Sequence, residues 1–215
     1  MAKQSKSSNR WLKEHFDDPY VKKAWQEGYR ARAAYKLTEL QEKYHFLKPH
    51  QVVVDLGAAP GSWCQVAHKF IGKKSIIIAL DLLAIDPIEN VITLQGDFTS
   101  EAILELLQAE LKARHQTKKI DVVLSDMAPN MSGSKTADQA QSMYLVELAF
   151  DFAKTHLKKG GALITKVFQG RDLDTLIVEA KKQFTKVHLC KPDASRDRSA
   201  EHFLVCLSYR GLKAE

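Results

Sequence analysis

The sequence predicts an α/β fold: a doubly wound, mostly parallel seven-stranded sheet with helices on both faces, preceded by an N-terminal helical arm. Three observations predict it. Short apolar runs alternate with longer amphipathic stretches along most of the 215 residues. Several of the runs are continuously apolar, as in strands that are covered on both faces. The chain is also long enough to bury one substantial core, and no linker or internal repeat indicates a second domain.

Seven short apolar runs are predicted to form the strands. They are Val52–Leu56, Ser75–Leu80, Val91–Leu94, Ile120–Ser125, Ala162–Phe168, Lys186–Leu189 and Phe203–Tyr209, with the weakest pattern at Lys186–Leu189. Amphipathic stretches between them predict helices over residues 63–71, 100–114, 137–157 and 172–184.

Residues 1–48 are predicted to form a basic N-terminal arm within the same single domain, and residues 49–215 its main part. From about residue 31, the apolar residues Ala34, Leu37, Leu40 and Tyr44 recur at helical spacing, and Pro49 lies beyond the end of this helix.

Most of the excess positive charge lies in this arm. The whole chain has a net charge of +6, and residues 1–50 contain 11 Lys and Arg against 6 Asp and Glu, a net charge of +5. This asymmetry favours a polyanion-binding arm on a nearly neutral domain, although an ordinary solvated basic helix would have the same composition. Aromatic residues that could stack on bases, or dock the arm on the core, are interleaved with the charges: Trp11, Phe16, Tyr20, Trp25, Tyr29 and Tyr35.

The sequence contains no candidate membrane span. Its densest apolar run, Ile76–Leu80, is followed at once by Asp81, and residues 1–16 have no apolar signal-peptide core. Three separated cysteines without a Cys-x-x-Cys pair indicate reduced thiols, and no Cys/His cluster has metal-ligand spacing. We therefore expect a cytoplasmic protein that binds neither a membrane nor a metal.

Acidic residues and glycines follow the first three predicted strands, where α/β proteins bind ligands. Asp55, Gly57 and Gly61 lie at the end of the first strand, and Asp81 and Asp97 follow the next two. Carboxylates in these places can accept hydrogen bonds from ribose hydroxyls and from the exocyclic amine of adenine. Together they predict a pocket for an adenosine without phosphate. The stretch is not Gly-x-Gly-x-x-Gly, which counts against a nicotinamide oxidoreductase.

Lys166 is the most unusual residue, because it lies within an apolar predicted strand. A lysine is almost never fully buried without a partner, so it requires an acidic neighbour or a functional reason. Asp126 at the tip of the adjacent strand would supply that partner. Glu201 directly precedes the last predicted strand and would reach the same edge if that strand runs antiparallel. Lys36 in the N-terminal helix is a further candidate.

Six stretches carry a resemblance to the FtsJ (RrmJ) family of S-adenosylmethionine-dependent ribose 2′-O-methyltransferases. They are residues 32–37 (RAAYKL), 54–61 (VDLGAAPG), 96–98 (GDF), 125–133 (SDMAPNMSG), 166–170 (KVFQG) and 191–196 (KPDASR). The resemblance covers about residues 10–209. Ser62 stands where Gly is frequent in the family, and Tyr35 where another aromatic is frequent.

The resemblance implies a Rossmann-like methyltransferase fold over residues 49–215 and a set of site residues. The family's catalytic Lys–Asp–Lys–Glu tetrad falls on Lys36, Asp126, Lys166 and Glu201. Contacts to S-adenosylmethionine fall on Gly61, Trp63, Asp81, Asp97 and Asp126, beside Asp55 and Gly57 of the predicted pocket. Separately, the basic charge of the N-terminal arm makes Arg30, Arg32 and Lys36 the candidates for contacts with RNA.

The implied function is 2′-O-methylation of a uridine in large-subunit (23S) ribosomal RNA, in the 50S particle, by a monomeric enzyme. Lys166 is the expected general base and S-adenosylmethionine the methyl donor, with no metal. The compact chain favours the bacterial large-subunit enzymes. Methylation of a tRNA anticodon-loop ribose, or a non-catalytic role as an RNA-binding ribosome assembly factor, are the alternatives.

Overall fold

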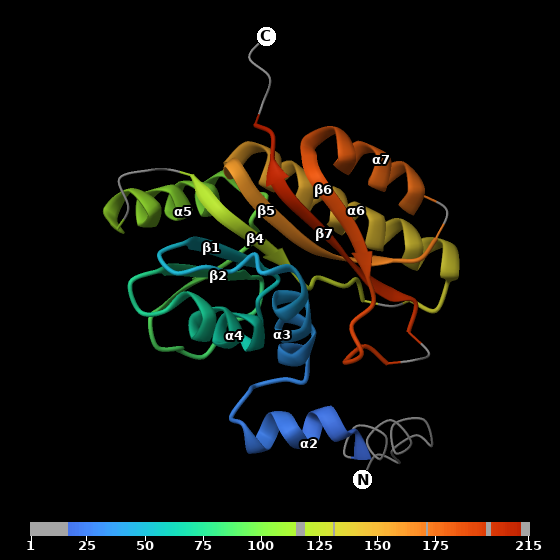
Figure 1. The fold of residues 1–215 in the computed structure, drawn as a ribbon, viewed down its shortest axis with the longest axis horizontal. Coiled ribbons are helices and arrows are strands. Elements are labelled where there is room, and N and C mark those ends of the chain that lie inside the picture. The colour runs from blue at the N-terminus through green and yellow to red at the C-terminus, as the bar shows by residue number, and fades with distance from the viewer. Residues whose placement is uncertain (1–16, 115–118, 131, 171, 197–198, 212–215) are drawn as a thin grey trace.

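The computed structural model describes residues 17–114, 119–130, 132–170, 172–196 and 199–211, so Trp11 and Phe16 lie outside the described residues. Its seven strands form one sheet in the order β3-β2-β1-β4-β5-β7-β6 (Figure 1). The strands are β1 (Val52–Leu56), β2 (Ile76–Asp81), β3 (Val91–Gln95), β4 (Ile120–Ser125), β5 (Leu157–Phe168), β6 (Phe184–Cys190) and β7 (Glu201–Tyr209).

Among the described residues, two helices precede the sheet and four are interleaved with its strands. They are α2 (Pro19–Gln26), α3 (Ala33–Tyr44), α4 (Ser62–Ile71), α5 (Glu101–Arg114), α6 (Lys135–His156) and α7 (Leu173–Gln183). The fold class, all seven strands and the five predicted helices are confirmed. Within the described ranges, none of the helices has the length and apolar character that crossing a membrane requires.

The structure corrects the prediction in three places. Helix α2 was not predicted; it begins at Asp18, whose carboxylate accepts a hydrogen bond from the Tyr20 N–H at 3.0 Å. Strand β5 begins five residues earlier than predicted, because Leu157 pairs with Ile120 beyond a register shift. Glu201 does not precede the last strand but is the first residue of β7, where it pairs with Phe168.

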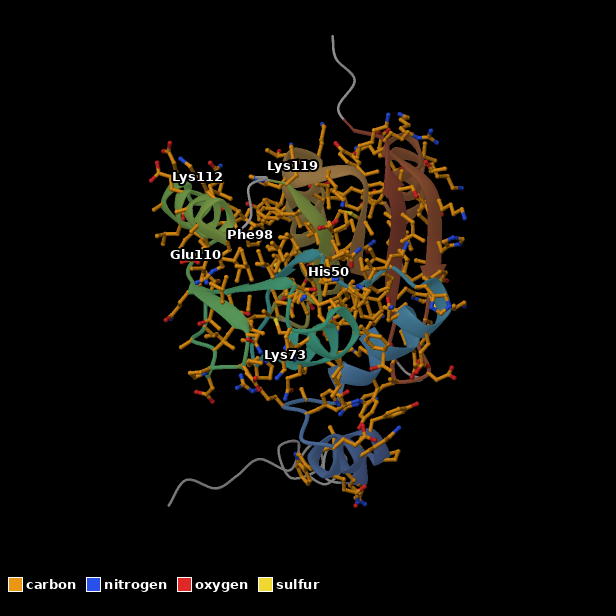
Figure 2. The ribbon with its side chains drawn as sticks, turned by 60° about the vertical axis from the view of Figure 1, so that its left-hand side comes forward. His50, Lys73, Phe98, Glu110, Lys112 and Lys119 are labelled. Carbon is orange, nitrogen blue, oxygen red and sulfur yellow. The ribbon has the colours of Figure 1, made fainter. Side chains whose placement is uncertain are left out.

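The sheet separates two layers of helices (Figure 1), and each layer packs an apolar core against the sheet. Helices α3 and α4 cover one face, where Val53 belongs to their core cluster. Helices α5, α6 and α7 cover the other face, where Val52 and Val54 pack. Successive strand residues point to opposite faces, so a continuously apolar strand such as β1 serves both layers. This explains why the strands read as unbroken apolar runs. Figure 2 shows side chains between the sheet and both helical layers.

Strand direction brings the functional candidates to one edge of the sheet. Strands β1 to β5 are parallel, and their carboxyl ends therefore meet at this edge. Strand β7 runs antiparallel to β5, so its first residue, Glu201, lies at the same edge. The pairing of Ser125 with Thr165 places the next residues, Asp126 and Lys166, side by side.

Helix α3 ends in a turn that Gln41 holds. Its buried side-chain amide donates to the Leu47 carbonyl at 2.9 Å, and its carbonyl accepts from the Leu47 N–H at 2.7 Å. Both backbone groups of Leu47 lie out of contact with water, and no helix or strand pairs them. Gln41 thus fixes the connection from α3 to β1.

We expect Gln41→Ala to lower the free energy of unfolding by about 2–4 kcal/mol, because it leaves two buried backbone groups unpaired. Urea unfolding measures the change. Glu42→Ala, an exposed site on the same helix, is the control and should stay within about 0.5 kcal/mol. Equal stability of the two variants would show that Gln41 does not hold this turn.

Candidate active site

Four charged side chains from separate parts of the chain meet at the carboxyl edge of the sheet. Lys166 comes from β5, Asp126 directly follows β4, Glu201 begins β7, and Lys36 lies on α3. The structure therefore brings together all four residues of the expected tetrad. Lys166 is only 7% exposed, although it lies near the end of its strand.

The four side chains form a chain of alternating charges. Lys166 Nζ lies 2.7 Å from Asp126 Oδ1 and donates to the backbone carbonyl of Asp126 at 2.9 Å. On its other side, Lys166 Nζ lies 3.7 Å from Glu201 Oε2. The other oxygen of Glu201, Oε1, lies 2.7 Å from Lys36 Nζ. Each ammonium thus has a carboxylate neighbour, and Glu201 joins the two lysines.

The environment favours the ionised form of Glu201. Burial alone would raise the pKa of this carboxyl, but Lys36 and Lys166 outweigh burial and hold it below its usual value. The Ser195 hydroxyl also donates to Glu201 Oε1, at 2.8 Å. A negative Glu201 therefore lies between two cationic side chains.

The loop between β1 and α4 approaches the strand edge closely because of its glycines. Gly57 has φ +71°, and a Cβ there would overlap the side chain of Met127. Gly61 has φ +102° and begins α4 without a side chain to cap it. N–H groups of the first helical turn thus have no side-chain cap, an arrangement that suits an anionic group such as a carboxylate.

Arg30 clamps this loop to the segment that follows β2. Its guanidinium donates to the carbonyls of Pro60, Asp86 and Pro87, at 2.8, 2.8 and 2.9 Å. Gln65 of α4 accepts from the Arg30 N–H at 2.9 Å. The side chain predicted to contact RNA is therefore bonded to the walls of the candidate donor pocket.

Asp81 and Asp97 lie at the ends of the neighbouring strands, as predicted, and each organises its own loop. Asp81 accepts from the Ala59 N–H and the Leu83 N–H, both at 2.8 Å. Asp97 Oδ1 accepts from the Thr99 N–H at 2.9 Å and the Thr99 hydroxyl at 2.7 Å. A carboxylate oxygen can accept more than one hydrogen bond, so both residues keep capacity for a ligand.

Asp55 lies beneath this loop and is 1% exposed. Its Oδ2 accepts from the Cys64 thiol at 3.2 Å, whereas its buried Oδ1 has no hydrogen-bond partner among the described residues. Burial raises the pKa of the Asp55 carboxyl to about 8, although the hydrogen bond from Cys64 opposes part of this shift. An unpaired buried carboxyl oxygen fits a site whose remaining partner is a cationic ligand group.

Two of the predicted residues make contacts that residue type did not reveal. The Trp63 indole is buried against Phe203 and donates to the Ala33 carbonyl at 2.8 Å. Arg32 forms an ion pair with Asp18 and donates to the Ala194 carbonyl at 2.5 Å. Like Arg30, its guanidinium has partners within the chain.

Asp138 was not predicted from the sequence, yet it shapes the loop after Asp126. It accepts from the N–H and hydroxyl of Ser132, both at 2.7 Å, and from the Gly133 N–H at 3.1 Å. The signal was an acidic residue in the first turn of a predicted helix, a few residues after a Ser-Gly pair. This signal indicates where a helix starts, but it does not indicate that the side chain holds the loop next to Asp126.

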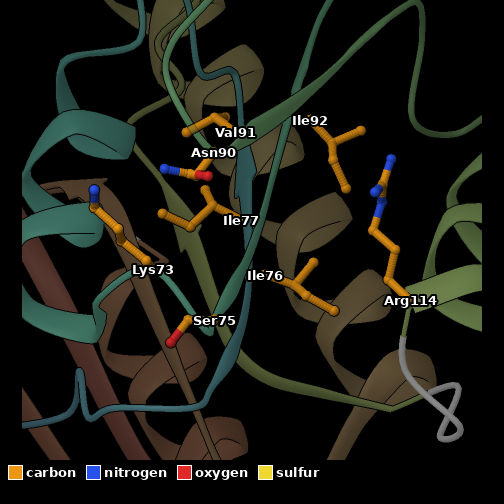
Figure 3. A pocket seen from close by; sticks show the side chains of 8 residues that line it. All are labelled: Lys73, Ser75, Ile76, Ile77, Asn90, Val91, Ile92 and Arg114. Carbon is orange, nitrogen blue, oxygen red and sulfur yellow. The ribbon is translucent and has the colours of Figure 1, made fainter.

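The amino edge of the sheet holds a separate pocket of about 330 Å³ at the first residues of β2 and β3. Lys73 and Arg114 stand on opposite sides of these strands (Figure 3). Four basic side chains labelled in Figure 2 lie well apart from one another and form no cluster at this pocket: His50, Lys73, Lys112 and Lys119. Within the described residues, no three His, Cys, Asp or Glu side chains are placed to hold a metal ion.

The FtsJ-like methyltransferase family matches residues 29–209. The chain is 52% identical over 208 residues to ribosomal RNA large subunit methyltransferase E of Azoarcus sp. (strain BH72), covering 97% of this chain and 100% of the relative. The same-named protein of Pseudomonas aeruginosa (strain PAO1) is 50% identical, over 96% of this chain and 98% of the relative.

The fold is also similar to a crystal structure of a ribosomal RNA methyltransferase from Plasmodium falciparum. The TM-score is 0.74 at 36% identity, covering 86% of this chain and 100% of the other chain.

We expect Asp55→Asn to remove a pH dependence of stability. The pKa of the Asp55 carboxyl is raised to about 8, so its contribution is fully present below its unfolded value near pH 4 and is lost as pH rises toward 8. Asn does not titrate. Relative to Asp55→Asn, the parent protein should lose up to about 1.4 kcal/mol per pH unit between pH 5 and 7.5.

Urea unfolding across that pH range measures the difference, with Asp151→Asn on the exposed face of α6 as the control. Parallel pH profiles for the parent and Asp55→Asn would show that the buried carboxyl keeps an ordinary pKa.

Proposed function

The chain belongs to the FtsJ-like methyltransferase family, and from this premise we propose that it transfers a methyl group from S-adenosylmethionine to a ribose 2′-hydroxyl of large-subunit ribosomal RNA. The observation that carries the proposal is the alternating chain Lys36–Glu201–Lys166–Asp126 beside the glycine loop. It places a buried amine between two carboxylates at the edge where a donor would lie.

The residues around the glycine loop fit the parts of the donor. The first turn of α4 and the unpaired oxygen of Asp55 are complementary to an amino-acid carboxylate and ammonium. Asp81 would accept from the ribose hydroxyls, and Asp97 from the adenine amine. When bound, S-adenosylmethionine supplies a methyl group that is already activated on a sulfonium sulfur. The protein must then align the acceptor and remove one proton.

Lys166 is the residue best placed to remove that proton. In its amine form, Lys166 Nζ would accept the proton of the 2′-hydroxyl and become an ammonium. The hydroxyl oxygen would bond to the methyl carbon as the methyl–sulfur bond breaks, and the electron pair of that bond would stay on the donor sulfur. Asp126 and Glu201 then stabilise the positive charge that has formed. Lys36 keeps Glu201 ionised and in place. Asp126 pairs with Lys166, and the next residue, Met127, lies against Gly57 of the glycine loop, so this segment connects the two halves of the site.

The proposed RNA substrate rests on the relatives and on the charge distribution. Three relatives that are about 50% identical to this chain carry the name ribosomal RNA large subunit methyltransferase E. Most of the excess positive charge lies in residues 1–50. RNA contact by Arg30, Arg32 and Lys36 remains a prediction. We propose a uridine of 23S rRNA, reached in the 50S particle by a monomer in the cytoplasm.

We expect Lys166→Ala to bind S-adenosylmethionine as the parent does but to transfer methyl groups roughly 10²–10⁴ times more slowly. A loss of this size is usual when a general base is removed. Calorimetry measures donor affinity, and single-turnover transfer of a labelled methyl group measures chemistry. A single-turnover rate close to that of the parent would assign the proton transfer to another group.

The substrate is tested by methyl incorporation into 50S particles, protein-free rRNA and bulk tRNA from cells that lack the enzyme. We expect the 50S particle to be labelled most, at a ribose 2′-oxygen located by mass spectrometry, with Lys166→Ala as the inactive control. Preferential labelling of tRNA would support the anticodon-loop alternative and contradict the ribosomal substrate. No labelling of any RNA would favour a non-catalytic assembly factor.

A further inference from the structure

One face of α3 contacts the segment that leads into β7. Arg32 at the N-cap, Lys36 one turn later and Glu39 about one turn further share this face, since a helix repeats every 3.6 residues. Arg32 reaches the Ala194 carbonyl, and Lys36 reaches Glu201. The third residue, Glu39, has no role in the reaction described above.

The Glu39 carboxylate binds the backbone of this segment with both oxygens. Oε2 accepts from the Asp193 N–H at 2.6 Å, and Oε1 accepts from the Ala194 N–H at 3.0 Å. Hydrogen bonds to an ionised acceptor are among the stronger ones in proteins. Two adjacent N–H groups therefore meet two adjacent oxygens, which fixes the orientation of the peptide between Asp193 and Ala194.

The next residue in the chain carries this constraint to the tetrad. Ser195 follows Ala194 directly, is 3% exposed, and donates its hydroxyl to Glu201 Oε1 at 2.8 Å. The same oxygen lies 2.7 Å from Lys36 Nζ, while Glu201 Oε2 lies near Lys166. A displaced Ser195 would let the Glu201 carboxylate rotate, and the distance to Lys166 would change.

We propose that Glu39 is a positioning residue for methyl transfer, acting through the Asp193–Ser195 backbone to fix Glu201 beside Lys166. The inference rests on the proposed function of the tetrad. Only a carboxylate supplies two acceptor oxygens at this point. An amide keeps one acceptor and turns an N–H₂ toward the second backbone N–H, so Glu39→Gln loses one hydrogen bond and adds a donor–donor contact.

The test compares Glu39→Gln with Glu42→Gln, which removes the same charge from the same helix. Glu42 is exposed, and its carboxylate has no hydrogen bond or ion pair within the described part of the chain. Single-turnover transfer is measured with labelled S-adenosylmethionine and 50S particles from cells that lack the enzyme, both saturating. Donor affinity, particle affinity and the thermal midpoint are measured on the same samples.

Glu39→Gln should be at least about tenfold slower than Glu42→Gln, because small misplacements of catalytic groups have effects of this size. Its donor affinity and particle affinity should match the control, which separates positioning from a general loss of structure, and the lost hydrogen bond should lower its thermal midpoint by only a few degrees. Glu39→Asp should recover part of the rate, and Ser195→Ala, which breaks the next contact, should show the same selective loss.

Equal rates for Glu39→Gln and Glu42→Gln would overturn the inference while leaving the proposed function intact. A rate loss matched by losses of affinity and thermal stability, or a Ser195→Ala variant with the parental rate, would also overturn it. If the parent protein and Glu42→Gln both fail to methylate the particle, the proposed function itself fails.

Discussion

A lysine side chain inside a buried strand requires opposite charge around it, and this requirement organises the catalytic edge of the protein. Lys166 has Asp126 on one side and Glu201 on the other, and Glu201 in turn pairs with Lys36. These partners come from the end of β4, from β7 and from α3, so the site exists only when these elements have assembled around β5. The antiparallel β7 is essential to this arrangement, because its reversal brings Glu201 to the carboxyl edge of the parallel strands.

The half of the site that we propose for the donor is built differently, mostly from backbone. Glycines let the β1–α4 loop approach the strand ends, and Arg30 ties that loop to the segment after β2 through three carbonyls. Burial strongly raises the pKa of the Asp55 carboxyl here, and its unpaired buried oxygen is an unfavourable feature of the described part of the free protein. Such a feature is common where binding of a ligand supplies the missing partner.

The sequence was sufficient for the fold and for the pairing of Asp126 with Lys166. Continuous apolar runs indicate strands that are buried on both faces of the sheet. The order of the parallel strands then decides which carboxyl ends lie next to each other. It was not sufficient for Arg30, Trp63 or Glu39, whose partners are backbone groups 30 to 155 residues away in the chain. Every residue has the same backbone C=O, and every residue except proline has the same N–H, so such contacts leave no signal in residue type. The positive charge of Arg30 favoured a contact with RNA, whereas in the structure its guanidinium donates to backbone carbonyls of the same chain.

The central claim is that Lys36 and Glu201 act as one unit that holds Lys166 in position. A double-mutant cycle on single-turnover methyl transfer tests it most directly, with Lys36→Ala, Glu201→Ala and the combined variant all measured at saturating donor and 50S particle. Residues that work as a unit are strongly non-additive. The account predicts that the combined variant is no slower than the slower single variant. Losses that multiply would contradict it, because the two residues would then contribute independently.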